Sequence, residues 1–173
     1  VAHALGWPRE RVRVEVPEVG GGFGGKEHYP DVLATAAAVA ALKTGRPVRI
    51  VLDRAEDMRV TCKRHPSRIA FRTALDDRGA ILGMEIDTVL DAGAYETCSP
   101  VVLQRALFTS TGVYDIPAVR ARGRAVATDV VPSDAFRGFG APQALFAIEM
   151  HMDHLARRAG ADPVEYRRRS FLR

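Results

Sequence analysis

The chain has 173 residues, a net charge of +4 and 47% hydrophobic residues, which is enough apolar material for the core of a globular protein. Its basic residues are scattered except for a run at 167–169, which we interpret as a solvated helix face, so we expect no nucleic-acid partner. The longest apolar stretch, 32–42, is too short to span a bilayer, and the N-terminus shows no signal-peptide pattern, so we expect no membrane partner.

The first half of the chain alternates strand-like and helical segments. Valines alternate with charged residues in its first strand-like segment, whereas PVRIVL in the second is typical of a buried strand. The main helix is bounded by Asp31, a good N-cap, and by Gly45, which is suited to a helix end, and we expect Pro30 to break the chain before it. The predicted elements are strands over 11–16 and 47–52, a helix over 31–42 and a short helical turn over 55–60.

The second half of the chain begins with a hairpin, because two alternating runs flank the turn sequence Asp-Asp-Arg-Gly at 76–79. The run 101–108 fits a helix or a strand, and Asp162 with Pro163 is typical of a helix start. The predicted elements are strands over 69–75, 80–90 and 119–127 and helices over 144–159 and 163–171. This mixture predicts an α+β fold with a mixed or antiparallel sheet and helices packed on it, with no internal domain boundary over 1–173.

The segment GGGFGGKE at 20–27 is the most informative part of the sequence. Its many glycines let the backbone approach a ligand closely and let its N–H groups surround an anion or oxo group, with Glu27 beside them. The segment also fits a dinucleotide-binding loop, with Asp53 as the ribose-binding acid, and the start of a P-loop. Pro30 argues against the first, and Glu27, where a P-loop needs Ser or Thr, argues against the second. A surface hairpin without a ligand stays open as an alternative.

A second loop, at 133–140, repeats the combination of glycine and aromatic residues. Arg137 lies between Phe136 and Phe139, so the loop can present a guanidinium to phosphate or oxo anions beside rings that stack on flat heterocycles. A purely structural loop, with its Phe residues in the core, explains the same residues. Arg105 stands in an apolar run and would need a partner if it were buried, or it lies at an edge in water.

The two cysteines, Cys62 and Cys98, are far apart in the sequence and form no CxxC or Cys/His cluster. Their spacing signals neither a zinc site nor an iron–sulfur site. Two isolated thiols point to a reducing compartment, and we expect a cytoplasmic location.

Together these segments resemble the xanthine dehydrogenase/aldehyde oxidase family of molybdenum hydroxylases over essentially the whole chain. The matching stretches are GGGFGGKE, LKTGRPVRIVLDRAEDM, KRHP, QRALF, VYDIPAVRARG and AFRGFGAPQALFAIE, in this order and spacing. The resemblance implies part of a molybdopterin-binding domain in a xanthine-dehydrogenase-like oxidoreductase. The implied reaction is the water-derived hydroxylation of a purine or a similar aromatic heterocycle. An aldehyde or nicotinate hydroxylase and a non-catalytic remnant or excised domain are the alternatives.

The resemblance also implies roles for individual residues. Glu27 and Arg105 would contact the purine and act in catalysis, and Phe139 would be one of the rings that clamp a flat substrate. Purine hydroxylases of the family keep this Glu/Arg pair, whereas its aldehyde oxidases tend to lose it. The main chain at Phe23 and the side chain of Arg137 would contact the molybdenum centre. The cofactor-binding set is Gly22, Phe23, Gly24 and Arg137.

Other parts of the family's machinery are expected outside this chain. The active-site glutamate of the family lies well downstream of the second loop, and a glutamine that bonds a molybdenum oxo ligand lies upstream of the glycine-rich loop. Iron–sulfur clusters and FAD belong to other modules, so we expect iron–sulfur and flavin subunits or domains as partners and an oligomer when complete. The chain has no initial Met and looks like an excerpt from a longer polypeptide, so we expect no activity from its 173 residues alone.

Overall fold

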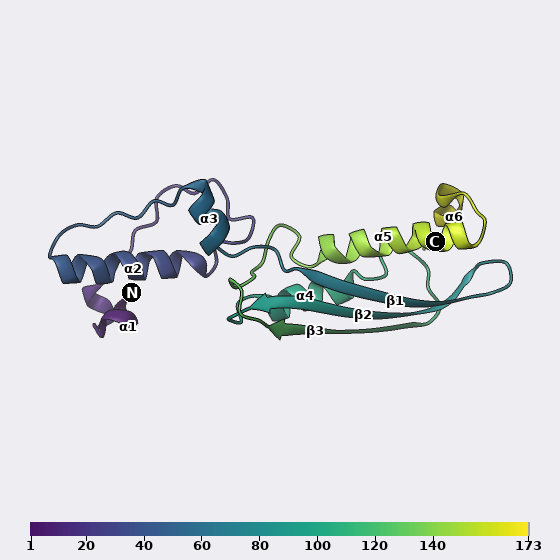
Figure 1. Cartoon of the computed structure of the whole chain (residues 1–173), viewed down its shortest axis with the longest axis horizontal. Coiled ribbons are helices and arrows are strands. Elements are labelled where there is room, and N and C mark those ends of the chain that lie inside the picture. The colour runs from purple at the N-terminus through teal and green to yellow at the C-terminus, as the bar shows by residue number, and fades with distance from the viewer. Residues whose placement is uncertain (173) are drawn as a thin grey trace.

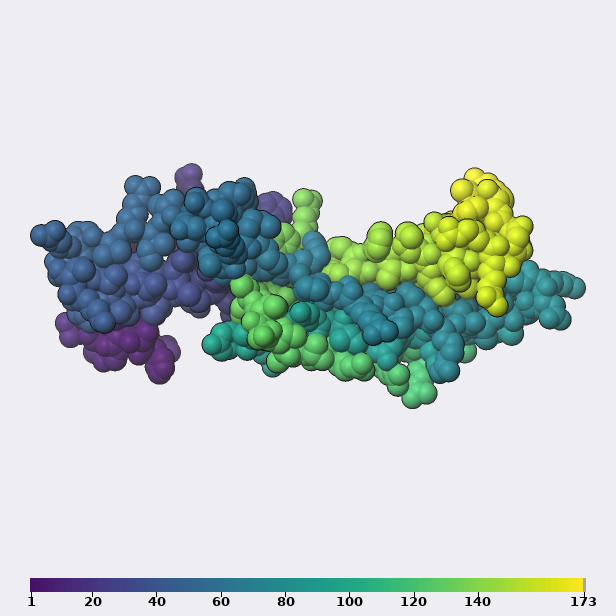
Figure 2. All heavy atoms as spheres, in the orientation of Figure 1, coloured from purple at the N-terminus to yellow at the C-terminus, as the bar shows by residue number. Residues whose placement is uncertain are grey.

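The computed structural model describes residues 1–172 and is elongated, with two lobes side by side (Figures 1 and 2). A helical lobe holds α1 to α3, and a sheet lobe holds the three strands with α4 to α6 (Figure 1). No helix in the described part of the chain is long and apolar enough to cross a membrane.

The helical lobe is thinly packed. Its elements are α1 (Ala2–Leu5), the 3-10 helix η1 (Arg9–Arg11), α2 (Tyr29–Thr44) and α3 (Arg54–Val60), and none of them contains a buried residue. The longest helix of the lobe, α2, is only partly buried along its run of alanines. The short helix α3 confirms the predicted helical turn and is held by a capping box, in which Asp53 accepts a hydrogen bond from Glu56 N at 2.8 Å.

Two expectations for the main helix of this lobe are wrong, and one is confirmed. The main helix begins at Tyr29 with His28 as its N-cap, so Asp31 lies inside the first turn and is no cap. Pro30 does not break the chain, because a proline in the first helical turn sacrifices no intrahelical hydrogen bond. The predicted end at Gly45 is confirmed by its left-handed backbone, with φ 64°.

The strands predicted over 11–16 and 47–52 are absent. Neither segment belongs to a strand, and the hydrophobic side chains Val16 and Val51 are 75% and 68% exposed. A strand needs a hydrogen-bonded neighbour along its edge, and none lies beside these segments among residues 1–172.

The sheet lobe is built on a mixed sheet, one of the two sheet types that the sequence predicts, and the strand order is β1-β2-β3. Strands β1 (Ser67–Leu75) and β2 (Ile81–Gly93) form the expected antiparallel hairpin. Strand β3 (Val119–Ala127) lies parallel to β2 and is reached through α4 (Ser99–Phe108), which resolves the ambiguity of that segment in favour of a helix. A parallel pair needs such a crossover connection.

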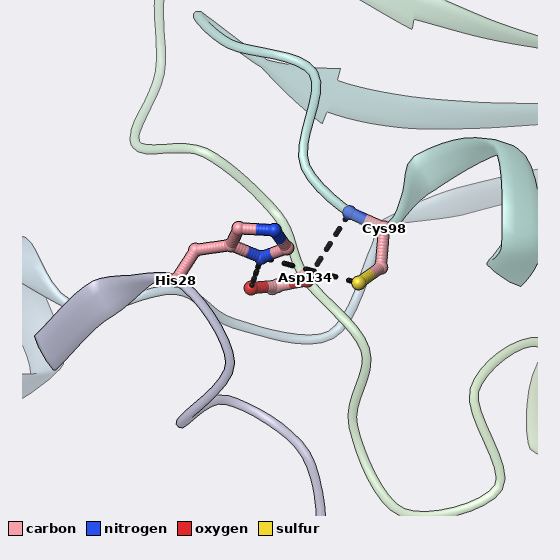
Figure 3. Close-up of side chains that lie close together, drawn as sticks. All are labelled: His28, Cys98 and Asp134. Atoms are coloured by element: carbon pink, nitrogen blue, oxygen red, sulfur yellow. Dashed lines mark hydrogen bonds and ion pairs between the residues drawn. The ribbon is translucent and has the colours of Figure 1, made fainter. Parts of the chain in front are cut away.

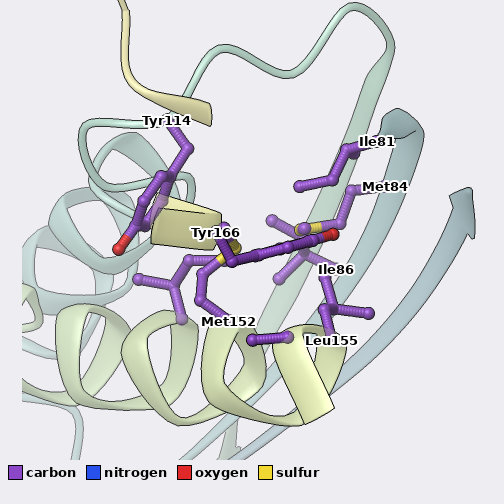
Figure 4. Close-up of a cluster of buried hydrophobic side chains, with 9 residues drawn as sticks. Ile81, Met84, Ile86, Tyr114, Met152, Leu155 and Tyr166 are labelled. Carbon is purple, nitrogen blue, oxygen red and sulfur yellow. The ribbon is translucent and has the colours of Figure 1, made fainter. Parts of the chain in front are cut away.

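The core lies between the sheet and α5 (Ala141–Arg158), and α6 (Pro163–Ser170) covers its end (Figure 4). Residues of α5 at helical spacing pack on residues of β2 that share one face of the strand. Tyr166 of α6 lies in this core and donates a hydrogen bond to Gly79 O at 2.9 Å. The buried cluster consists of Ile81, Met84, Ile86, Tyr114, Ile148, Met152, Leu155, Ala156 and Tyr166.

Helix α6 confirms the predicted cap but corrects our interpretation of the basic run. Asp162 accepts hydrogen bonds from the first turn of the helix, as expected. Arg167, however, is not a free surface charge, because it donates to Glu149 and Asp153 of α5 at 2.7 Å each. The basic run at 167–169 therefore faces solvent in part and also links α6 to α5 through the ion pairs of Arg167.

Candidate active site

The glycine-rich loop and the second loop lie side by side where the two lobes meet. Gly24 forms an antiparallel bridge with Phe136. The approach needs glycine, because a Cβ on Gly24 would lie 2.3 Å from Ala135 O and the backbone has φ +84°. The glycine-rich loop and the second loop, which are far apart in the sequence, are therefore packed directly against each other.

Phe23 projects from the tip of the glycine-rich loop. Its backbone is left-handed, with φ 50°, and its side chain is 63% exposed. The Arg137 guanidinium lies over its ring, with 5.4 Å between the guanidinium carbon and the ring centre. Lys26 Nζ donates to Gly21 O at 2.9 Å and closes the loop from its other side.

The second loop is fixed from two directions. Arg64 donates a hydrogen bond from Nη2 to Arg137 O at 2.9 Å, so the KRHP segment holds the backbone that carries the Arg137 side chain. On the other side, Gly140 lies so close to α4 that a Cβ would be 2.1 Å from Val102 O. Both contacts position the loop without using the guanidinium of Arg137 itself.

The two loops and the start of α4 border an open cavity of about 400 Å³. Five of the seven expected site residues line it: Phe23, Gly24, Glu27, Arg137 and Phe139. The remaining lining residues are Cys98, Val101, Ala135, Phe136 and Gly138.

Two expected site residues stand next to this cavity rather than in its wall. Gly22 is exposed, and a Cβ added to it would meet no atom within 4 Å. Arg105 is an exposed residue of α4, and its guanidinium carbon lies 5.2 Å from the ring centre of Phe139. The structure thus puts Arg105 against a wall residue, and the view that it is an isolated edge charge in water is incomplete.

The free donors of the site fit an anionic or oxo-bearing group. Among residues 1–172, the main-chain N–H groups of Gly22 and Phe23 donate no hydrogen bond, and the Arg137 side chain has no hydrogen-bond or ion-pair partner. Backbone N–H groups and a guanidinium are the donors that bind phosphate and oxo groups. Glu27 contributes an exposed carboxylate that accepts a hydrogen bond from its neighbour Lys26 N at 3.1 Å. The residues present therefore fit a molybdopterin-type cofactor with a polar substrate beside it.

Sequence reasoning missed a group of polar residues behind the cavity. His65 is 2% exposed and its Nε2 lies 2.7 Å from Ser99 Oγ, which links the KRHP segment to the start of α4. Burial lowers the pKa of His65 despite the nearby Asp134 carboxylate. In the sequence, His65 stood out only as part of the matching stretch KRHP.

Asp134, Cys98 and His28 form a second polar group (Figure 3). Burial alone would raise the pKa of Asp134, but hydrogen bonds from Ala135 N, His28 and Cys98 outweigh burial and hold the pKa below its ordinary value. Burial and the Asp134 carboxylate raise the pKa of the Cys98 thiol to about 11. No spacing in the sequence reveals this group, because His28 and Asp134 are 106 positions apart.

Comparisons with known proteins agree on the family of this chain. A family model described as the molybdopterin cofactor-binding domain matches residues 1–171. The chain is 40% identical to xanthine dehydrogenase/oxidase of Rattus norvegicus over 173 residues, which is 100% of this chain and 13% of the rat protein. It is 39% identical to aldehyde oxidase 3 of Mus musculus, again over 100% of this chain and 13% of the relative.

A solved structure supports the same assignment. Quinoline 2-oxidoreductase from Pseudomonas putida 86 superposes with a TM-score of 0.79 at 34% identity, covering 99% of this chain and 22% of the solved chain. The matched region is therefore a small part of each relative.

Proposed function

The chain belongs to the molybdopterin cofactor-binding domain family of the xanthine dehydrogenase and aldehyde oxidase group, and from that premise we propose that it forms one wall of the site of a purine hydroxylase. The observation that carries the proposal is the shared cavity of the two loops. It combines free donors for the cofactor with aromatic rings and a carboxylate for the substrate.

We assign the cofactor to the glycine-rich loop and Arg137. The main chain at Gly22, Phe23 and Gly24 would hold it by close backbone approach, and the Arg137 guanidinium would pair with its anionic groups. When bound, the cofactor supplies the two-electron oxidation of the hydroxylation, with water as the source of oxygen. Because Arg64 fixes the backbone of Arg137, that guanidinium is available to the cofactor and is not consumed in holding the loop.

We assign the substrate to the other side of the cavity. The Phe139 ring would stack on a flat heterocycle, and Glu27 would hydrogen-bond its ring nitrogen or exocyclic group. Nucleophilic attack on a purine builds negative charge on the ring, and the Arg105 guanidinium would stabilise that charge. The stacking of Arg105 on Phe139 places the positive charge beside the ring that would clamp the substrate.

Aldehyde or quinoline-like substrates are the second candidate. The named relatives include an aldehyde oxidase and a quinoline oxidoreductase at similar identity. The presence of both Glu27 and Arg105 favours a purine, since a purine offers ring nitrogens and exocyclic groups to both side chains, whereas a simple aldehyde offers only its carbonyl oxygen. A non-catalytic module with the same fold is the remaining alternative.

We further propose that residues 1–173 act as one cofactor-binding unit, because both lobes contribute to the cavity. The chain spans 13% of the rat relative's length. We propose that the catalytic glutamate, the contacts with iron–sulfur and flavin partners and the oligomer interface are features of the complete enzyme. A cytoplasmic location stays a prediction.

The test is to express the complete subunit and to measure bound molybdenum and the hydroxylation of hypoxanthine, xanthine, nicotinate and an aldehyde. We expect molybdenum in the purified protein and faster turnover of the purines. Molybdenum without purine turnover would favour the aldehyde or nicotinate alternative. A folded protein without molybdenum would favour the non-catalytic module.

A further inference from the structure

Three side chains with metal-binding atoms meet where the helical lobe joins the sheet lobe (Figure 3). His28 comes from the start of α2, Cys98 from the start of α4 and Asp134 from the second loop. Their ligand atoms all lie within 4.8 Å of one another. We propose that His28 Nδ1, Cys98 Sγ and an Asp134 carboxylate oxygen bind a divalent cation of the zinc class, at a site separate from the molybdenum cofactor.

The distances fit a tetrahedral ion. His28 Nδ1 lies 3.1 Å from Asp134 Oδ2 and 3.9 Å from Cys98 Sγ. With zinc–ligand bonds of roughly 2.0–2.3 Å, adjacent ligand atoms of a tetrahedral site are about 3.3–3.7 Å apart. Small rotations of the side chains therefore bring the three atoms to binding distance.

The charges of the site also fit a divalent ion. The Asp134 side chain is fully buried, and a buried carboxylate is costly unless a positive charge or donors balance it. Its Oδ1 accepts hydrogen bonds from Ala135 N at 2.8 Å and Cys98 N at 3.3 Å, which leaves Oδ2 directed at His28. A divalent cation with one carboxylate, one thiolate and a neutral imidazole is electrically balanced, and the thiol proton passes to solvent when the sulfur binds.

The donor set selects the class of metal. A thiolate and an imidazole are poor ligands for Mg²⁺ and Ca²⁺, which take oxygen, and good ligands for zinc and its neighbours. The His28 side chain is half exposed, so an ion can enter from solvent and water can complete its coordination. The two backbone donors to Oδ1 of Asp134 orient the carboxylate, as outer contacts do in known zinc sites.

Such an ion would fix the cavity of the proposed cofactor site from behind. Each ligand is a wall residue of that cavity or the neighbour of one: His28 follows Glu27, Cys98 lines the wall itself, and Asp134 precedes Ala135. One ion would tie the end of the glycine-rich loop to α4 and to the second loop. The role of the ion is to position these segments, and it does not take part in the hydroxylation.

The experiment is a titration of the purified, metal-free protein with Zn²⁺ against a chromophoric chelator, and in parallel with Co²⁺. We expect one equivalent of tightly bound Zn²⁺, and for Co²⁺ the near-ultraviolet band of a thiolate ligand. Cys98→Ser should abolish that band and weaken Zn²⁺ binding by about tenfold or more, with a similar loss in His28→Gln and Asp134→Asn.

The matched controls are Cys62→Ser, which removes the other thiol, and His3→Gln, which removes an exposed histidine. Both should bind Zn²⁺ like the wild type, and circular dichroism checks the fold of each variant. Absence of stoichiometric Zn²⁺ from folded protein, or unchanged binding in folded Cys98→Ser, overturns the proposal. Molybdenum content and hydroxylation are measured separately, so the Zn²⁺ titration can still be interpreted if the proposed function fails its own test.

Discussion

The guanidinium carbon of Arg137 lies 5.4 Å from the centre of the Phe23 ring, so a side chain of the second loop covers the tip of the glycine-rich loop. The two residues are held by different contacts: Phe23 by the bridge at Gly24, and Arg137 by the hydrogen bond from Arg64 to its carbonyl oxygen. Neither backbone anchor depends on the guanidinium. The contact between them can therefore yield to a bound anion without loss of the loop structure.

Arg137→Met is expected to lower the molybdenum content of the complete enzyme by about tenfold, since hydrogen bonds to a charged group contribute roughly 1.5–3 kcal/mol. Its melting temperature should change little, because an exposed cation–π contact contributes only about 0.5–1 kcal/mol. Metal analysis and a thermal melt on the same samples check both. Arg68→Met, an exposed change on β1, is the control. A variant that keeps full molybdenum would contradict the role of Arg137.

Two glycine substitutions separate loop structure from cofactor contact. Gly24→Ala puts a Cβ 2.3 Å from Ala135 O at a left-handed position, so the free energy of unfolding should fall by about 2 kcal/mol or more. Gly22→Ala meets open space and should change stability by less than about 0.5 kcal/mol, while its methyl group obstructs the backbone approach of the cofactor. Urea unfolding and molybdenum content distinguish the two. Equal stability of both variants would show that the loops are not packed as described.

The sequence predicts the local structure of the sheet lobe well. The alternation around 76–79 and the cap at Asp162 are local signals, and β1, β2 and α6 appear where those signals place them. The strand pattern of 47–52 is equally clear, but a strand also needs a neighbour, and the pattern carries no information about one. Pro30 was misjudged because the helix begins one residue before it.

The candidate site is predicted only in part, for a similar reason. The resemblance identifies Phe23, Glu27, Arg137 and Phe139, which do line one cavity. The contact between Arg105 and Phe139 depends on how α4 packs beside the second loop, and no spacing encodes that.

Arg105→Met tests the proposed substrate assignment. If Arg105 stabilises negative charge on a purine ring, purine turnover should fall by about 100-fold or more, with a smaller loss for an aldehyde. Steady-state kinetics of both substrates on enzyme with equal molybdenum content provide the measurement. Phe139→Leu should instead raise KM for every flat substrate, because it removes a stacking surface. Equal losses for purine and aldehyde in Arg105→Met would rule out the purine-specific role.

The stability of the protein should decrease as the pH falls from about 7.5 to 5, because of buried histidine. Burial lowers the pKa of His65 from its ordinary 6.5, so the unfolded chain binds a proton in this range that the folded chain does not, and acid favours unfolding. Burial lowers the pKa of His151 in the same way, whereas Asp134, whose pKa is held below 3.8, acts only at lower pH. His65→Gln should therefore be less stable at neutral pH but show a shallower pH dependence, with the remaining slope due to His151. Urea unfolding across this range measures how the free energy of unfolding changes with pH. The control His3→Gln should show the same pH dependence as the wild type. An unchanged pH dependence in His65→Gln would show that His65 is not the group responsible.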